Sequence, residues 1–181
     1  MKKFVTWLAC IVWLLPVMAG ADQRPARGKL LVATELVQGE IFAETVILLL
    51  DYDENGAMGL VVNRPTEIEP KELLADVHGI FGYSGTLFWG GPVRMTSVRA
   101  LLRTDTPPEN AKAVVDSVYR VPFDDSLLDA PTDPATVRLF MGYAGWGAGQ
   151  LDSEMATGSW HVVPASSHPS LESALRCSGD R

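Results

Sequence analysis

The sequence has few of the side chains that usually bind metals or form disulfide frameworks. Its 181 residues include 2 cysteines and 3 histidines, too few for a disulfide scaffold and a poor basis for a structural zinc site. His161 and His168 are seven residues apart, and the chain has no His-Glu-x-x-His motif. The sequence therefore predicts no metal and no other cofactor.

Basic side chains are also in deficit. The chain has 15 Lys and Arg against 22 Asp and Glu, a formal net charge of −7, so its overall field repels a polyanion. No helix-turn-helix pattern with basic recognition positions is present. We therefore expect no direct binding to nucleic acids. The length and the hydrophobic content of 47% are typical of one compact domain.

A complete motif for nucleophilic catalysis is missing. The segment Gly82-Tyr83-Ser84-Gly85-Thr86 resembles a nucleophile elbow, but threonine stands where that motif needs its last glycine. The three histidines, His78, His161 and His168, show no pattern of a catalytic base. The sequence therefore assigns no catalytic residue and favours a protein that is not an enzyme.

The N-terminus has the outline of a secretory signal peptide. Lys2 and Lys3 precede an uncharged apolar run over residues 4–19, and Ala19-Gly20-Ala21 supplies the small residues of a cleavage site. An uncleaved anchor is the alternative, but the run is shorter than the ~20 residues of a membrane-spanning helix and Pro16 interrupts it. We predict cleavage after Ala21, a periplasmic or secreted mature protein and no stable membrane span, with a cytoplasmic location as the alternative.

The rest of the chain divides into a linker, one domain and a tail. Residues 22–28 are polar and read as the linker, residues 29–166 as the domain, and residues 167–181 as a short C-terminal tail. Cleavage would remove Cys10 and leave Cys177 as the last thiol. Cys177 is then either an incidental residue of the tail or the donor of an intermolecular disulfide.

Strand patterns outnumber helical ones in the domain. Residues 44–51 predict a strand buried on both faces, because the apolar run within them, residues 46–50, is unbroken. Asn55-Gly56 then predicts a hairpin with a type I′ turn and Gly56 at positive φ. Further strands are expected at 29–33, 57–63, 87–89, 98–102, 114–121, 136–141 and 160–163, helices at 69–74 and 148–155, and loops at 78–86, 104–110 and 124–134. The predicted fold class is α+β, a single domain with a mostly antiparallel sheet and packed helices.

Three segments together resemble the YqgE/AlgH family of bacterial proteins. They are Asn55-Gly56-Ala57-Met58-Gly59-Leu60-Val61-Val62-Asn63-Arg64-Pro65, Gly90-Gly91-Pro92-Val93, and Gly142-Tyr143-Ala144-Gly145-Trp146-Gly147-Ala148-Gly149-Gln150-Leu151. The resemblance extends over about residues 28–166 and implies an AlgH-like α+β domain without assigned catalytic residues. One branch of the family is named as a transcriptional regulator. The signal peptide departs from the family pattern and argues against a cytoplasmic regulatory role here.

The glycine-rich segment Gly145–Gly149 follows a predicted strand and opens a predicted helix. Its backbone amides could bind an anion; alternatively, the glycines allow a tight turn and Trp146 packs in the core. Arg64 could bind a carboxylate or form a structural clamp onto Glu154 or another acidic residue. Glu154 shares a helix face with Gln150. Because strand ends gather into pockets, the candidate ligand-binding residues are Asn63, Arg64, Gly90, Gly91, Tyr143, Gly145, Trp146, Gly147 and Gln150.

These observations predict a YqgE/AlgH-like protein that is exported, is not an enzyme and binds a protein partner or a small ligand. The alternative is a transcriptional regulator of the AlgH branch that acts indirectly, without direct contact with nucleic acid.

Overall fold

The computed structural model describes residues 23–37, 39, 41–77, 79–123, 125–128 and 136–165. The predicted signal peptide, its cleavage site, Cys177 and the tail 167–181 lie outside the described residues, and so do His78 and His168. Within the described segments, no helix is long and apolar enough to cross a membrane.

The described residues form nine strands, joined in one sheet, and four short helical segments. The strands are β1 (Lys29–Ala33), β2 (Val46–Asp53), β3 (Gly56–Val61), β4 (Leu87–Trp89), β5 (Val93–Arg103), β6 (Lys112–Val115), β7 (Val118–Val121), β8 (Val137–Gly147) and β9 (Trp160–Pro164). The helical segments are α1 (Pro70–Leu73), α2 (Gln150–Ala156) and the 3-10 turns η1 (Ile80–Gly82) and η2 (Asp125–Leu128).

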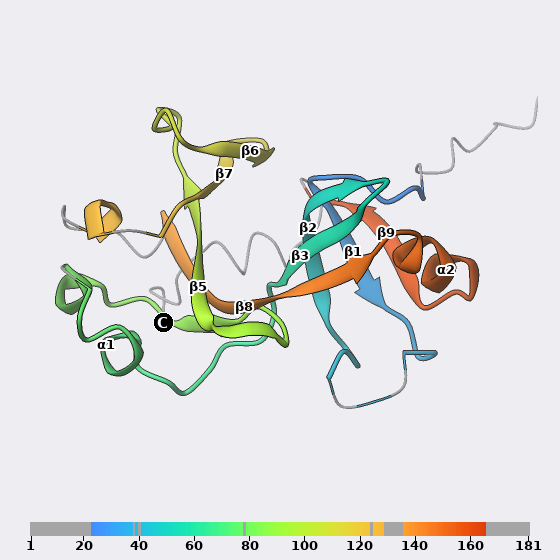
Figure 1. Ribbon diagram of the computed structural model, residues 1–181, viewed down its shortest axis with the longest axis horizontal. Coiled ribbons are helices and arrows are strands. Elements are labelled where there is room, and N and C mark those ends of the chain that lie inside the picture. Colours follow the sequence, from blue (N-terminus) through green and yellow to red (C-terminus); the bar gives the residue numbers. More distant parts are fainter. Residues whose placement is uncertain are drawn as a thin grey trace, which may run out of the picture.

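Strand β8 connects the two halves of the sheet. The strand order is β6-β7-β5-β8-β3-β2-β1-β9, all antiparallel, and β4 adds to β8 in parallel. The first part of β8 pairs with β5 and β4, and its last residues pair with β3. Figure 1 shows β8 running from the half that contains β5, β6 and β7 to the half that contains β1, β2, β3, β9 and α2. At the bend between these parts Gly142 has a φ of +70°, and a Cβ there would lie 2.3 Å from the carbonyl oxygen of Gly91, so the bend requires glycine.

Strand β2 is buried on both faces, as its unbroken apolar run predicts. Leu48 and Leu50 pack in a core shared by both halves of the sheet, whereas Ile47 and Leu49 pack in a second core beneath α2. A third core contains Leu139 and Met141 of β8 and lies under η1 and η2. Because the sheet curves into a half-barrel, its own strands cover much of the apolar surface.

The predicted antiparallel single domain is confirmed, but the helical part of the prediction is too large. Helix α1 has 4 residues and α2 has 7. The predicted strand over 114–121 is wrong: it is the β6–β7 hairpin, which reverses at Asp116, a residue with a φ of +46°. The pattern misled because both arms are apolar and the turn contains neither glycine nor proline.

The glycine-rich segment is also mostly strand. Strand β8 extends through Gly147, whereas the strand predicted from the sequence ended at residue 141. Gly145 pairs with Met58 and Gly147 pairs with Gly56. Strand glycines are typical of places where neighbouring groups approach closely, and here a Cβ on Gly145 would lie 3.2 Å from the ring of Tyr143.

The β2–β3 hairpin exists, but its turn is not of the predicted type. Gly56 has the expected positive φ, at +138°. Asp53 pairs with Gly56, so the turn residues are Glu54 and Asn55, neither of which has positive φ. A type I′ turn is therefore wrong. The side chain of Asp53 accepts a hydrogen bond from the amide of Asn55 at 2.7 Å, which stabilises an Asx turn and moves the reversal one residue earlier.

Candidate functional site

The strand β8 and the β2–β3 hairpin border an open hollow of about 470 Å³. We call it the hairpin hollow. Four of the predicted ligand-binding residues line it, all from the end of β8: Tyr143, Gly145, Trp146 and Gly147. Its other lining residues are Asp51, Asp53, Asn55, Gly56, Ala57, Met58 and Val93.

The glycines leave the backbone of β8 open on this face. Gly145 and Gly147 are exposed, and a Cβ added to Gly147 would meet no atom within 4 Å. Successive strand residues point to opposite faces, so Trp146 between them points away into the core beneath α2, where it is 8% exposed. The hollow therefore has a backbone floor, with Tyr143 and Met58 as side-chain walls.

Helix α2 is tied to the sheet through Glu154. Its Oε2 accepts hydrogen bonds from Nε1 of Trp146 at 2.9 Å and Nε1 of Trp160 at 2.8 Å. Its Oε1 accepts one from Nε2 of Gln150 at 2.9 Å, which confirms that Gln150 and Glu154 share a helix face. The oxygen Oε1 of Gln150 accepts the amide of Gly147 at 3.1 Å. The indole of Trp146 thus packs in the core, and Gln150 caps the end of β8 rather than lining the hollow.

Asn63 and Arg64 bind the segment before β2, residues 41–44, rather than the hairpin hollow. Arg64 donates from Nη1 to the carbonyl oxygen of Ile41 at 2.6 Å and from Nη2 to that of Ala43 at 2.8 Å. Asn63 donates to the carbonyl oxygen of Glu44 at 2.8 Å. The guanidinium of Arg64 also lies 5.2 Å from the ring centroid of Trp89. The expected clamp onto Glu154 is therefore wrong, because that carboxylate is bound to the two tryptophans and Gln150.

Gly90 and Gly91 allow the chain between β4 and β5 to lie against β8. A Cβ on Gly91 would lie 2.2 Å from the carbonyl carbon of Tyr143, and one on Gly90 would lie 2.6 Å from the carbonyl oxygen of Gly142. Neither glycine lines the hairpin hollow. Of the nine candidate residues, Asn63, Arg64, Gly90, Gly91 and Gln150 thus lie outside it.

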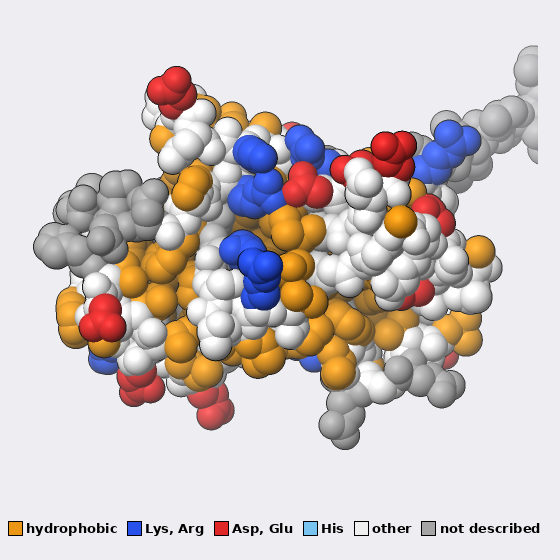
Figure 2. Space-filling view, in the orientation of Figure 1, with side chains coloured by type: hydrophobic (Ala, Val, Ile, Leu, Met, Phe, Trp, Pro, Cys, Tyr) orange, Lys and Arg blue, Asp and Glu red, His pale blue; other side chains and the backbone are white. Residues whose placement is uncertain are grey.

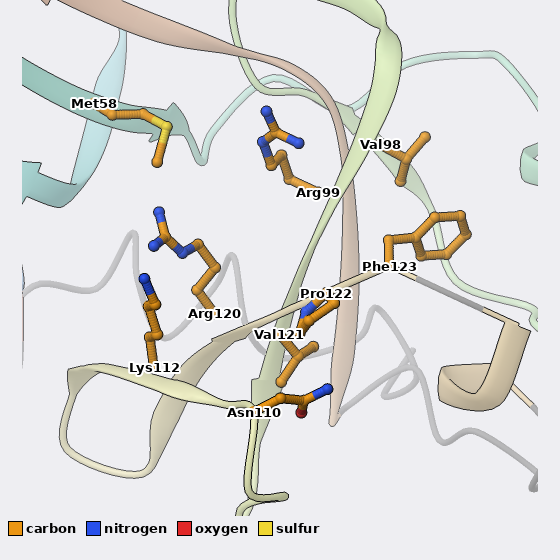
Figure 3. Close-up of a pocket in the computed structure, with 9 residues that line it drawn as sticks. All are labelled: Met58, Val98, Arg99, Asn110, Lys112, Arg120, Val121, Pro122 and Phe123. Carbon is orange, nitrogen blue, oxygen red and sulfur yellow. The ribbon is translucent and has the colours of Figure 1, made fainter.

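A second hollow, of about 290 Å³, lies next to the first and shares Met58 with it. We call it the basic hollow because Arg99, Lys112 and Arg120 line it. Figure 3 shows the charged ends of Lys112 and Arg120 pointing the same way, towards Met58, with the guanidinium of Arg99 nearby. In Figure 2 basic side chains gather in the middle of this face, above hydrophobic surface. The remaining lining residues are Val98, Asn110, Val121, Pro122 and Phe123.

One carboxylate, that of Asp51, borders this group of cations. Its Oδ2 lies 2.7 Å from Nη1 of Arg120, and its Oδ1 lies 3.3 Å from Nη2 of Arg27. The guanidinium of Arg99 lies 5.2 Å from the ring centroid of Tyr143. Tyr143 is a wall of the hairpin hollow, so Arg99 and Tyr143 connect the two hollows.

Sequence reasoning missed Arg99, Lys112 and Arg120. They come from three strands, β5, β6 and β7, and no short motif contains them. The available signal was a charged residue inside each of two apolar runs, Val98-Arg99-Ala100 and Tyr119-Arg120-Val121. Across the described part of the chain, no group of three or more His, Cys, Asp or Glu side chains is placed to hold a metal ion.

The comparisons with known proteins show the family. A family model described as AlgH-like matches residues 30–176. The chain belongs to the AlgH-like family. A UPF0301 protein of Streptomyces coelicolor is 37% identical over 143 residues, which cover 75% of this chain and 74% of that protein. A UPF0301 protein of Chlorobium limicola is 34% identical over 142 residues, 76% of this chain and 74% of its own length.

Two solved structures have the same fold. The solution structure of the AlgH protein from Pseudomonas aeruginosa has a TM-score of 0.64 and 27% sequence identity, and the match covers 80% of each chain. The crystal structure of protein DIP2367 from Corynebacterium diphtheriae has a TM-score of 0.64 and 26% identity, covering 78% of this chain and 76% of that one. The family resemblance seen in the sequence motifs is thereby confirmed.

Proposed function

We propose that this protein is an exported, non-enzymatic binding domain that takes a small ligand across the hairpin hollow and the basic hollow. The observation that carries the proposal is the open backbone of β8 between Tyr143 and Met58, directly beside a second hollow lined by cations. Ligand sites are concave and combine apolar walls with a few polar groups that fix orientation. The joined hollows have both.

The chemistry of the lining residues favours binding over catalysis. Among the residues that line the two hollows there is no serine, cysteine or histidine. The carboxylate of Asp51 is held by Arg120 and Arg27, so it is engaged in ion pairs rather than free to act as a base. Donors, a carboxylate, an aromatic wall and a backbone floor suit recognition of a ligand.

A ligand panel tests the binding proposal. Nucleotides, carboxylates and short peptides, the peptides standing for a segment of a protein partner, are added separately while amide resonances are followed. We expect at least one compound to shift Gly145 and Gly147 saturably, with Gly158, beyond the far end of α2, unchanged. Gly147→Ala should remove these shifts while the protein stays folded, because the added methyl enters the hollow without meeting protein atoms. Silence of both amides across the whole panel would contradict the proposal.

Export is tested by determining the N-terminus of the protein in cell fractions. A start at Asp22 in the envelope fraction supports cleavage after Ala21, whereas an intact Met1 in the soluble cytoplasm contradicts it. The alternative of a regulator that acts indirectly on transcription needs a cytoplasmic protein, so the same experiment separates the two functions.

A further inference from the structure

We infer that the basic hollow is a binding site for a phosphate group, which makes the ligand of this domain a phosphorylated compound. The inference rests on the proposed function and adds the chemical class of the ligand. It is carried by the surplus of positive charge in the hollow, by the way the strands place that charge, and by the apolar walls that continue from it.

The first argument is the charge balance. The protein as a whole is acidic, yet three cations line this hollow. The ion pairs of Asp51 involve Arg120 and Arg27, and among the described residues no carboxylate lies within salt-bridge distance of Arg99 or Lys112. A phosphate monoester, with a charge of about −1.5 to −2 near neutral pH, matches this surplus better than a single carboxylate.

The second argument is the strand register. Lys112 on β6 lies directly opposite Arg120 on β7, and like charges at opposed positions of an antiparallel pair are destabilising. Arg99, on the adjacent β5, is half-buried and so partly desolvated. A bound anion would relieve this repulsion and would accept hydrogen bonds from two guanidinium groups, which suit phosphate geometry.

The position of Asp51 provides a test of the site. Its carboxylate lies 2.7 Å from Arg120 and therefore competes with any ligand anion for that guanidinium. Asp53, two residues along the same strand, forms no described ion pair; its side chain accepts the amide of Asn55 in the turn. The two aspartates thus form a matched pair, one in contact with the cations and one apart from them.

The organic part of the ligand would lie beside Tyr143 and Met58. Arg99 lies over the ring of Tyr143, and Met58 belongs to both hollows. A phosphate held by Arg99 therefore places its substituent against these apolar walls. Phenyl phosphate should consequently bind more tightly than inorganic phosphate.

The test uses inorganic phosphate as the probe, titrated into the purified protein at low ionic strength. The side-chain Nε–H resonances of Arg99 and Arg120 should shift saturably, and added sodium chloride should weaken binding. Arg99→Gln should raise Kd at least tenfold, a difference of about 1.4 kcal/mol. Arg94→Gln is the control, because Arg94 is exposed on the same strand and lines neither hollow; its Kd should stay within twofold of wild type.

Removing the carboxylate of Asp51 should change Kd in the direction opposite to Arg99→Gln. Asp51→Asn should tighten phosphate binding at least threefold, because Arg120 loses its competing carboxylate. Asp53 lines the hairpin hollow but not the basic hollow. Asp53→Asn therefore removes the same charge away from the phosphate site, keeps an oxygen that can accept the amide of Asn55, and should change the Kd of inorganic phosphate less than twofold. Equal effects of the two variants, or no effect of Arg99→Gln, would overturn the phosphate site.

The result also separates this inference from the proposed function. If phosphate causes no saturable shift at Arg99 while an uncharged compound still shifts Gly145, the phosphate inference is wrong and ligand binding in the hairpin hollow stands. If phosphate binds as expected but no organic compound, phenyl phosphate included, shifts Gly145 or Gly147, the proposed function is wrong and the basic hollow is an isolated anion site.

Discussion

Truncation of Glu154 should weaken the attachment of α2 to the sheet, because this carboxylate accepts the indole N–H groups of two tryptophans. Trp146 donates to it at 2.9 Å and Trp160 at 2.8 Å. Both rings are buried, with exposed fractions of 8% and 4%, and they meet edge to face with centroids 6.1 Å apart. In Glu154→Ala both indole donors lose their acceptor.

The size of the effect follows from the cost of an unsatisfied buried donor, about 1–3 kcal/mol each. Because Glu154 is half-buried, water can replace part of the lost bonding, and we expect Glu154→Ala to lower the free energy of unfolding by about 2–4 kcal/mol in total. In a protein of this length such a loss lowers Tm by roughly 4–16 °C. Glu154→Gln keeps a carbonyl acceptor and loses only the charge, so its cost should be about 1 kcal/mol.

Urea and thermal unfolding, followed by tryptophan fluorescence, measure these differences. Glu109→Ala is the control: Glu109 is exposed and makes no described side-chain contact, so its effect should stay within about 0.5 kcal/mol. A Glu154→Ala variant as stable as the control would refute the view that this carboxylate fixes α2 to β8 and β9.

Three further predictions concern the backbone, a clamp and a titration. Gly56→Ala should lower the free energy of unfolding by about 2 kcal/mol or more, since Gly56 has a φ of +138° and a Cβ would lie 2.2 Å from a carbonyl oxygen of β8. Gly147→Ala is the control and should be nearly neutral; equal Tm losses in the two variants would contradict this. Arg64→Ala should cost about 2–3 kcal/mol in urea unfolding, because two carbonyl groups lose their donor; an unchanged midpoint would show that the clamp is dispensable. The hydrogen bond to Asp152, followed by burial and the negative charge of Asp152, raises the pKa of Tyr52 above 10.0. The stability that this hydrogen bond contributes is therefore present below pH 10 and lost as the pH rises through the raised pKa. Asp152→Asn should lower one tyrosine pKa in an absorbance titration, and four unchanged tyrosine titrations would contradict the contact.

Local sequence signals predicted much of the sheet. Strands 29–33 and 87–89 have the predicted bounds, because each is a short apolar run limited by glycine, proline or polar residues. The two-faced burial of β2 also followed from its composition. These features depend on a few neighbouring residues, and so they can be read without knowledge of the rest of the fold.

Features that depend on strand register could not be predicted in this way. The β6–β7 hairpin reverses at Asp116, which adopts positive φ although it is neither glycine nor asparagine. The length of β8 depends on its pairing with β3, which continues strand structure through Gly145 and Gly147. Pairing with a distant strand thus overrode the local preference of glycine for a loop.

The candidate site was predicted in part. Tyr143, Gly145 and Gly147 line a hollow, whereas Arg64 is engaged with backbone carbonyl groups on another part of the molecule. The basic hollow escaped prediction because β5, β6 and β7 bring its cations together only in the folded sheet. Spacing along the chain carries no information about such a group.

The most direct test of the proposed function follows the methyl group of Met58, the residue shared by the two hollows. Methionine methyl groups are labelled with carbon-13, and Met58→Leu assigns the resonance of this residue. The account predicts that phenyl phosphate shifts the Met58 methyl saturably and leaves that of Met95, 45% exposed and outside both hollows, unchanged. A Met58 methyl that is unmoved by phenyl phosphate and by every compound of the ligand panel would contradict it.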